Sequence, residues 1–264
     1  MAAGSFAAVM GLLYSKRRVS GGARGFTEFE SVALTSSLSL TDLTEKVTLS
    51  LIDSFARADA EDRPYRHWVL TDVLPSGMTE VLRSLPFAAP DLGGLSGKRE
   101  LHNDQRSYFD INANLRFDAC AAVADAFQST RVCLAIQAKT GADLSGTYVR
   151  LEYAQDVDGF WLEPHTDLGV KRFTMLIYLP ESPEQADLGT DIYSAPGAWS
   201  KRPAFVDNTA LVFVPGADTW HGLAPRPIPG VRRSIIMNYV TTEWRARDQL
   251  AYPDQPVLVD AEGL

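Results

Sequence analysis

The sequence predicts an α+β protein that is mainly β, with helices in its first half and a barrel or jelly roll in its second. Two observations lead to this class. Helical spacing of apolar residues is confined to the part of the chain before Gly146. After Gly146 the chain consists of short runs of β-branched and aromatic residues, separated by Pro, Gly, Asn and Asp, with no long helical segment between them. A parallel sheet built of βαβ units is therefore disfavoured.

The first half is expected to contain three helices and one strand. Thr41 can cap the first helix, in which apolar residues recur every four positions, and Pro86 ends the second. Asp118 can cap the third, whose alanine and leucine spacing predicts packing against a sheet. In chain order the segments read "DLTEKVTLSLIDSFARA", strand "HWVLTD", "SGMTEVLRSLP" and "ACAAVADAFQSTRVCLAIQAK".

The second half is expected to supply the β core. Its runs are five to seven residues long and rich in residues that favour strands. Their close spacing indicates antiparallel connections by turns and short loops. The runs are "TYVRLEY", "FTMLIYL", "DIYSA", "ALVFVP" and "SIIMNYV".

The amino terminus, "MAAGSFAAVMGLLYSKRR", has an apolar run that is followed, not preceded, by basic residues and is too short to span a bilayer. We expect residues 1–27 to form a flexible tail, with docking onto the domain or a membrane surface as the alternative. Residues 28–264 are expected to form a single domain. Its parts are a helical support region over about 28–145, a β core over about 146–242 and a C-terminal tail over 243–264.

The bulk properties exclude some functions. At 264 residues and 45% hydrophobic the chain can bury one large core, and its formal net charge of −8 opposes binding to a phosphate backbone. We therefore expect neither a nucleic-acid nor a membrane partner. The two cysteines, Cys120 and Cys133, form no CxxC motif, so we expect free thiols and a cytoplasmic protein.

A possible metal site lies in "EPHTDLG", where one threonine separates His165 from Asp167. In an extended segment the side chains at i and i+2 share a face. A third ligand can come from His221, which follows the strand "ALVFVP" and a Pro-Gly turn. Two imidazoles and one carboxylate with open positions form the arrangement of non-haem Fe(II) oxygenases. His-x-Asp alone is weak evidence, because a histidine in a β protein usually has a structural role.

Arg232 strengthens this interpretation, because it begins an apolar strand shortly after His221. Arg232 and Ser234 are expected on one face of that strand, and Arg233 on the other. An arginine against the interior would be an unpaired buried charge unless an anion meets it. A dicarboxylate cosubstrate would supply that anion, since the guanidinium fork suits a carboxylate.

This combination resembles the Fe(II)- and 2-oxoglutarate-dependent oxygenases with a double-stranded β-helix, particularly their prolyl-4-hydroxylase-like branch. The resemblance covers about residues 146–242 and consists of an HxD motif, a distal histidine and an R-x-S strand. It implies that His165, Asp167 and His221 bind Fe(II). It further implies a cosubstrate site for 2-oxoglutarate, formed by Arg232, Ser234, Tyr178 and Tyr153.

The resemblance implies an enzyme that oxidises a C–H bond, with 2-oxoglutarate and O₂ as cosubstrates and succinate and CO₂ as products. Asp167 favours hydroxylation, because related halogenases have a small residue in its place. We expect a small-molecule substrate, since the helical first half can cover the barrel mouth. The alternatives are a peptide or protein substrate, and a cupin-like metal-binding protein in which Arg232 makes only a structural ion pair.

Several other residues have two interpretations. Phe160, Trp161 and Trp220 either wall a substrate pocket or simply pack. The polar segment 102–118 either forms a lid that brings Arg106 or Arg116 to an anionic substrate, or is a solvated loop.

The remaining charged residues and histidines are also ambiguous. Arg150 and Glu152, on one strand face, form an ion pair or contact substrate. Lys171 and Arg172 either steer an acidic substrate or belong to a solvated turn. The remaining histidines, His67 and His102, are expected to be structural and exposed, respectively.

Overall fold

The computed structural model describes residues 38–94, 96–98 and 105–259. The predicted tail over residues 1–27, the predicted start of the domain at residue 28 and His102 lie outside these ranges. From Leu38 onward the described residues belong to one compact unit.

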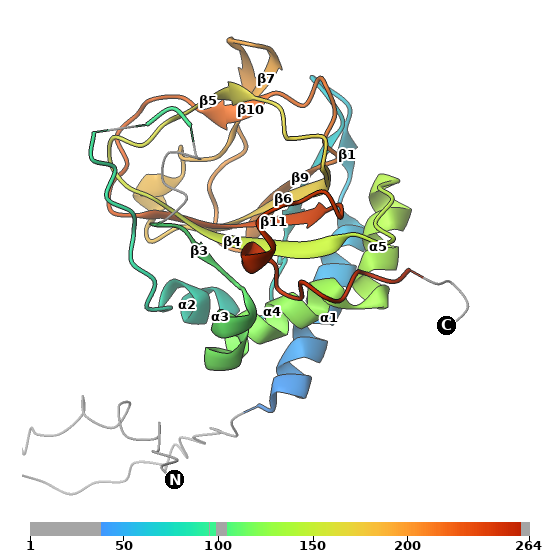
Figure 1. Ribbon diagram of the computed structural model, residues 1–264. Coiled ribbons are helices and arrows are strands. Elements are labelled where there is room, and N and C mark those ends of the chain that lie inside the picture. Colours follow the sequence, from blue (N-terminus) through green and yellow to red (C-terminus); the bar gives the residue numbers. More distant parts are fainter. Residues whose placement is uncertain (1–37, 95, 99–104, 260–264) are drawn as a thin grey trace, which may run out of the picture. The chain divides into compact units, whose positions relative to one another are not determined.

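Helices dominate the first part of this unit and strands the second, which confirms the predicted class (Figure 1). The helices are α1 (Leu40–Arg57), α2 (Met78–Arg83), α3 (Ile111–Arg116), α4 (Asp118–Gln128) and α5 (Thr130–Thr140), with 3-10 turns η2 (Pro183–Gln185) and η3 (Arg247–Gln249). The strands are β1 (Ala60–Glu61), β2 (His67–Thr71), β3 (Ser107–Tyr108), β4 (Tyr148–Asp156), β5 (Leu162–His165), β6 (Lys171–Leu179), β7 (Asp191–Ala195), β8 (Ala198–Lys201), β9 (Thr209–Phe213), β10 (His221–Leu223) and β11 (Arg232–Val240).

Two sheets carry the fold. The larger has the strand order β1-β2-β9-β6-β11-β4-β3, and the smaller has the order β5-β10-β7-β8. All pairings between these strands are antiparallel. Figure 1 shows α1, α4 and α5 against one face of the larger sheet and β5, β7 and β10 over the other. The predicted barrel is thus a two-sheet jelly roll supported by helices.

Side-chain alternation along the strands of the larger sheet produces two hydrophobic cores, one on each face of the sheet. Odd-numbered residues of β4, β6 and β11, such as Leu151, Met175 and Met237, pack against the helices. Even-numbered residues, such as Leu176 and Ile236, face the smaller sheet. The long strands are apolar on both faces because both are covered, and the polar residues on the even-numbered face therefore stand out.

The start of α1 corrects one prediction. The helix begins at Leu40, and its cap is Ser39, not Thr41. The Ser39 side chain accepts a hydrogen bond from the Asp42 N–H at 3.1 Å, which satisfies one of the free N–H groups of the first turn. Two candidate caps two residues apart cannot be distinguished by residue type alone.

The third predicted helix is two helices. Ser129 ends α4 in an extended conformation and accepts from the Val132 N–H to cap α5, and the two axes differ by 58°. The position expected as a cap, Asp118, is already the first residue of α4. The break lets α4 and α5 each contact α1.

The helical half also contributes strands to the larger sheet. The segment predicted as a strand, "HWVLTD", forms β2 and pairs with β9 in the β core. The short strand β3 pairs with β4 at the opposite edge and was not predicted. The division at residue 146 is therefore a division of composition, whereas the larger sheet draws on both halves.

The cysteines and helices bear on the chain's environment. Cys120 and Cys133 are buried and free. Among the described residues, no single helix is long and apolar enough to cross a membrane, and only the bent pair α4 and α5 together meets the same criteria.

Candidate metal centre

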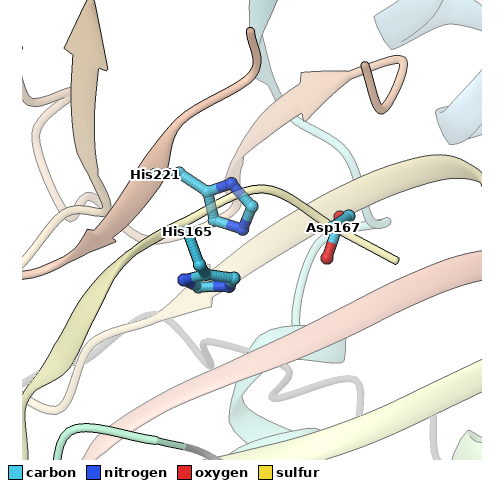
Figure 2. A group of neighbouring side chains, drawn as sticks. All are labelled: His165, Asp167 and His221. Atoms are coloured by element: carbon cyan, nitrogen blue, oxygen red, sulfur yellow. The ribbon is translucent and has the colours of Figure 1, made fainter. Parts of the chain in front are cut away.

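Strand pairing brings the three predicted metal ligands together. His165 ends β5 and His221 begins β10, and these two residues lie opposite each other in the antiparallel pair. Asp167 follows two residues after His165. One potential ligand atom from each residue lies within 4.8 Å of the others, and Figure 2 shows the side chains converging. This set is a carboxylate and two imidazoles, and strand pairing fixes the backbone of both histidines.

Backbone carbonyls orient both imidazoles. His165 Nδ1 lies 2.8 Å from the Glu163 oxygen, and His221 Nδ1 lies 2.9 Å from the Thr219 oxygen. A carbonyl can only accept, so each Nδ1 carries the proton and donates it. Each Nε2 therefore keeps its lone pair for a metal, as in most histidine-ligated sites.

The surroundings favour the protonation states that a metal requires. Burial lowers the pKa of His221 to about 4, although Asp167 acts in the opposite direction. Burial alone would raise the pKa of Asp167, but Lys171 and His221 outweigh it and hold this pKa well below its usual range. At neutral pH the site thus offers a neutral imidazole and an ionised carboxylate.

The pKa of His221 predicts a pH dependence of stability for the metal-free protein. In the unfolded chain the imidazole titrates near 6.5, whereas in the fold it stays neutral down to about 4. Between these values only the unfolded state takes up the proton. The free energy of unfolding therefore decreases as the pH is lowered from about 6.5 to about 4, by about 3 kcal/mol in total. Urea unfolding in the presence of a chelator measures this fall. An equally large fall in His221→Gln would contradict the assignment.

Hydrogen bonds hold the Asp167 carboxylate from the larger sheet. Lys171 Nζ lies 2.5 Å from one oxygen, and the Thr174 hydroxyl donates to the other at 2.5 Å. Thr174 in turn accepts from Asn238 Nδ2 at 2.9 Å. Thr174 and Asn238 are polar residues on the even-numbered face of apolar strands, and this alternation was a signal that the sequence interpretation did not use.

The ligands open into a cavity of about 320 Å³ between the sheets. Its walls combine apolar side chains, including Leu176, Leu223 and Ile236, with an unusual number of charged ones. Arg232 lines the same cavity as the three ligands, so the predicted metal ligands and the predicted cosubstrate arginine share one cavity. Such a volume lies within the range typical of small-molecule sites.

The predicted cosubstrate residues Arg232, Ser234 and Tyr178 lie on the same face of the larger sheet. Ser234 is paired with Tyr178 in the register between β11 and β6, and Arg232 is two residues away on β11. All three are buried. The Ser234 hydroxyl has no hydrogen-bond partner among the described residues, and such a buried group calls for a ligand or water. The donor set therefore fits a carboxylate.

Arg232 is not an unpaired charge, which corrects one step of the sequence argument. Its Nη1 lies 2.6 Å from Asp156 Oδ2, and its Nε donates to the Leu188 oxygen at 2.6 Å. Asp156 lies directly opposite Arg232 on β4. No external anion is needed to neutralise this arginine. These two contacts engage Nε and Nη1 of a guanidinium that has five N–H donors, so the ion pair does not exclude a carboxylate.

Tyr153 is not a cosubstrate residue, and this prediction was wrong. Its side chain points to the helices, where its hydroxyl donates to the Leu82 oxygen at 2.8 Å. The ring stacks on Phe109 and packs edge-on against Phe87. Tyr153 has an odd number on β4, whereas the residues of β4 that face the smaller sheet have even numbers.

The three flanking aromatics are not among the residues that line the cavity. Phe160 belongs to the core between the sheets, and Trp161 packs on Gly97. The backbone carbonyl of Trp220 accepts a hydrogen bond from the Tyr193 N–H at 2.9 Å. The aromatic residue that does line the cavity is Trp244, from the predicted C-terminal tail.

The structure also places the charged residues that the sequence left ambiguous, and Arg172 is exposed. Arg106, Arg150, Glu152 and Lys171 line the cavity, and the Arg150–Glu152 ion pair is formed at 3.1 Å. Arg116 instead lies over the Phe117 ring. His67 is buried in β2 with Nδ1 2.7 Å from the Tyr65 oxygen, as expected for a structural histidine.

Two further residues with a bearing on the site, Tyr65 and Asp156, were not predicted. Tyr65 itself packs edge-on against Phe213, and its buried hydroxyl has no hydrogen-bond partner among the described residues. Burial raises the pKa of Tyr65. The centre of the Phe213 ring lies 4.8 Å from that of His221, so Tyr65 is one side chain removed from a metal ligand. Asp156, the second residue that was not predicted, forms the ion pair with Arg232.

Comparison with solved structures identifies the fold. A prolyl hydroxylase from Trichoplax adhaerens, in complex with a hypoxia-inducible-factor oxygen-degradation-domain peptide, superposes with a TM-score of 0.51 at 12% identity, covering 77% of this chain and 93% of that one. The chain has the prolyl hydroxylase fold. This fold is the double-stranded β-helix that the sequence resemblance implied.

Two more distant structures also match. A Pseudomonas putida prolyl-4-hydroxylase has a TM-score of 0.48 at 16% identity, covering 74% of this chain and 99% of that one. HygX from Streptomyces hygroscopicus, with nickel and 2-oxoglutarate bound, has a TM-score of 0.41 at 15% identity, covering 67% of this chain and 82% of that one. No family model and no curated protein sequence matches the chain.

Proposed function

We propose that the protein is an Fe(II)- and 2-oxoglutarate-dependent dioxygenase that hydroxylates a C–H bond of a small molecule. The observation that carries the proposal is the convergence of His165, Asp167 and His221 at a cavity that also contains Arg232. The prolyl hydroxylase fold supports it, and in this chain the pairing of β5 with β10 sets His165 opposite His221.

The chain's residues would divide the work between two ends of the cavity. His165 and His221 present Nε2 and Asp167 a carboxylate oxygen to iron, which when bound supplies the redox chemistry that activates O₂. At the other end Arg232, which lines the cavity, binds the distal carboxylate of 2-oxoglutarate. Ser234, two residues along β11, does not itself line the cavity, and its unsatisfied hydroxyl is the proposed second donor.

The apolar side chains between these ends have a separate role. Leu176, Leu223 and Ile236 line the cavity and exclude water from the reacting atoms. Exclusion of water strengthens the electrostatic contacts that hold the cosubstrate and protects reactive species from solvent.

The size of the cavity supports a small-molecule substrate. A volume of about 320 Å³ suits a small ligand beside the cosubstrate. A peptide substrate is the alternative, and the Trichoplax adhaerens neighbour, which is bound to a peptide, favours it. Matched assays of succinate release with metabolite pools and with proline-containing peptides separate these two substrate classes.

A cupin-like metal-binding protein without turnover is the second candidate function. It predicts that Arg232 makes a structural ion pair, and the contact with Asp156 is such a pair. The proposed oxygenase differs in that Arg232 also binds the cosubstrate.

Anaerobic addition of Fe(II) and 2-oxoglutarate distinguishes the two functions. The oxygenase develops a weak visible charge-transfer band, because the cosubstrate chelates the iron that His165, Asp167 and His221 hold. In air it then releases succinate when a substrate is present. His165→Ala is the blank for both measurements. No band together with no succinate would rule out the oxygenase and leave the metal-binding protein.

We also propose a cytoplasmic location and a single domain over residues 28–264. Free buried cysteines support the first proposal, because thiols persist in reducing compartments. The compact unit formed from Leu38 onward supports the second. Cell fractionation and limited proteolysis test them.

A further inference from the structure

A row of polar side chains crosses the larger sheet next to the metal ligands. Thr174 on β6, Asn238 on β11 and Arg150 on β4 are neighbours in the strand register, with Asn238 between the other two. All three are buried. Burial of polar groups costs free energy unless their hydrogen bonds are satisfied, so the contacts within this row decide what it can do.

The row forms one chain of hydrogen bonds that ends on a metal ligand. Arg150 Nη1 donates to Asn238 Oδ1 at 3.2 Å, and Asn238 Nδ2 donates to Thr174 Oγ1 at 2.9 Å. The Thr174 hydroxyl donates to Asp167 Oδ2 at 2.5 Å. The chain therefore leads from Arg150, on the wall of the cavity, to the carboxylate of the candidate metal site.

Arg150 sets the direction of this chain. A guanidinium can only donate, so the Asn238 atom that faces it is the carbonyl oxygen. This orientation turns Nδ2 toward β6, where the Phe173 carbonyl, which can only accept, lies 3.4 Å from it. The Thr174 oxygen then accepts from Nδ2, and its single proton is left for Asp167.

Arg150 is itself held in place. Its Nε donates to Gln249 at 2.9 Å. The guanidinium carbon lies 5.0 Å from the centre of the Tyr108 ring and 4.8 Å from that of Trp244. The hydrogen bond and the cation–π contacts fix the guanidinium, so the chain begins at a stationary donor.

The two oxygens of Asp167 are held in different ways. Lys171 reaches Oδ1 through a flexible four-carbon stem, whereas Thr174 holds Oδ2 through a short side chain. Thr174 is also paired on both sides, with β9 and with β11, so its backbone is fixed. Thr174 therefore sets the rotation of the carboxylate. Groups that orient a metal ligand in this way typically contribute about ten- to a hundredfold to metal affinity.

We propose that Asn238 is a positioning residue for the metal ligand Asp167 and acts through Thr174, in a hydrogen-bond chain whose direction Arg150 sets. This inference rests on the metal site of the proposed function. It adds to that site a residue that is not among those lining the cavity.

The test is calorimetric titration of the full-length, metal-free protein with Mn(II). Thr174→Val removes the hydroxyl without changing the charge and lowers the affinity by about ten- to a hundredfold, whereas Thr174→Ser retains most of it. Asn238→Leu lowers the affinity by at least about threefold, because the Thr174 hydroxyl loses the donor that fixes its direction. In the double variant the affinity equals that of Thr174→Val alone, because a residue that acts through Thr174 has no effect once the hydroxyl is gone.

Controls separate positioning from a merely structural role. Thr79→Val, on α2, removes a buried hydroxyl that donates to Asp207 at 2.9 Å, and it lowers the free energy of unfolding without changing Mn(II) affinity. If Asn238→Leu does not fold, Asn238→Ala takes its place in the same cycle. Wild-type affinity in the Asn238 variant, or an equal loss with and without the Thr174 hydroxyl, overturns the inference. Thr174→Ser as weak as Thr174→Val also overturns it.

The charge-transfer band with Fe(II) and 2-oxoglutarate distinguishes failure of this inference from failure of the proposed function. A wild-type protein that binds Mn(II) but gives no band overturns the oxygenase, and the variants still decide the role of Asn238. A normal band with additive effects at Asn238 and Thr174 overturns only this inference. Absence of Mn(II) binding by the wild-type protein overturns both.

Discussion

Replacing Asp167 by alanine abolishes succinate release and lowers metal affinity by more than about a hundredfold. Loss of a group that only supports a ligand costs about ten- to a hundredfold, and Asp167 is itself a ligand in the proposed site. Two imidazoles remain, on backbone that β5 and β10 still hold in place. Calorimetric titration with Mn(II) measures the affinity, and succinate release with a stimulating substrate measures turnover.

Two further variants make this prediction specific. Asp167→Asn removes the charge but keeps an oxygen to which the Thr174 hydroxyl can donate, so its fold is preserved while its metal affinity falls. Asp218→Ala, an exposed residue in the loop before His221, changes neither property. Retention of wild-type affinity in Asp167→Ala would show that the three residues do not form the metal site.

Replacing Arg232 by alanine destabilises the protein by about 3–5 kcal/mol, because it removes one partner of a buried ion pair. The neighbouring Arg233→Ala costs about 1 kcal/mol or less, since its partner Glu181 is partly exposed. Binding of 2-oxoglutarate follows the same order and is lost only in Arg232→Ala. Urea unfolding gives the free energies, and the charge-transfer band gives the affinities.

A double variant separates stability from cosubstrate binding. Asp156→Asn combined with Arg232→Gln removes both charges of this buried pair, so most of the stability returns. Its affinity for 2-oxoglutarate stays low in the oxygenase. Equal affinities in Arg232→Ala and Arg233→Ala would show that the cosubstrate does not bind on this strand face.

The candidate site was largely predictable because period-2 alternation is a local property. Arg232 and Ser234 share the inner face of β11 and Arg233 lies on the other, as the alternation requires. The same rule could have excluded Tyr153, since Arg150 and Glu152 on its strand were already assigned to one face. A sequence match placed it near the cosubstrate, but its side chain lies in the other core.

Partners that meet through strand pairing could not be predicted. Asp156 and Arg232 are 76 residues apart in the chain, and only the register of β4 against β11 brings them together. The strands that carry the ligands pose a related problem. β5 has four residues and β10 three, too few for any hydrophobic pattern to emerge. Residues 162–165 and 221–223 could be recognised only by their histidines.

The backbone bonds that fix His165 and His221 affect which metal the protein carries. Their Nε2 atoms are presented before any ion arrives, so little energy of rearrangement is available to reject an unsuitable one. Nitrogen and oxygen donors bind divalent ions more tightly along the series from manganese through iron to copper, with zinc also ahead of iron. Affinity alone therefore ranks Fe(II) below its competitors. In the proposed oxygenase, iron loading would therefore depend on the supply of metals, and we expect protein purified without added iron to carry a tighter-binding ion such as nickel or zinc.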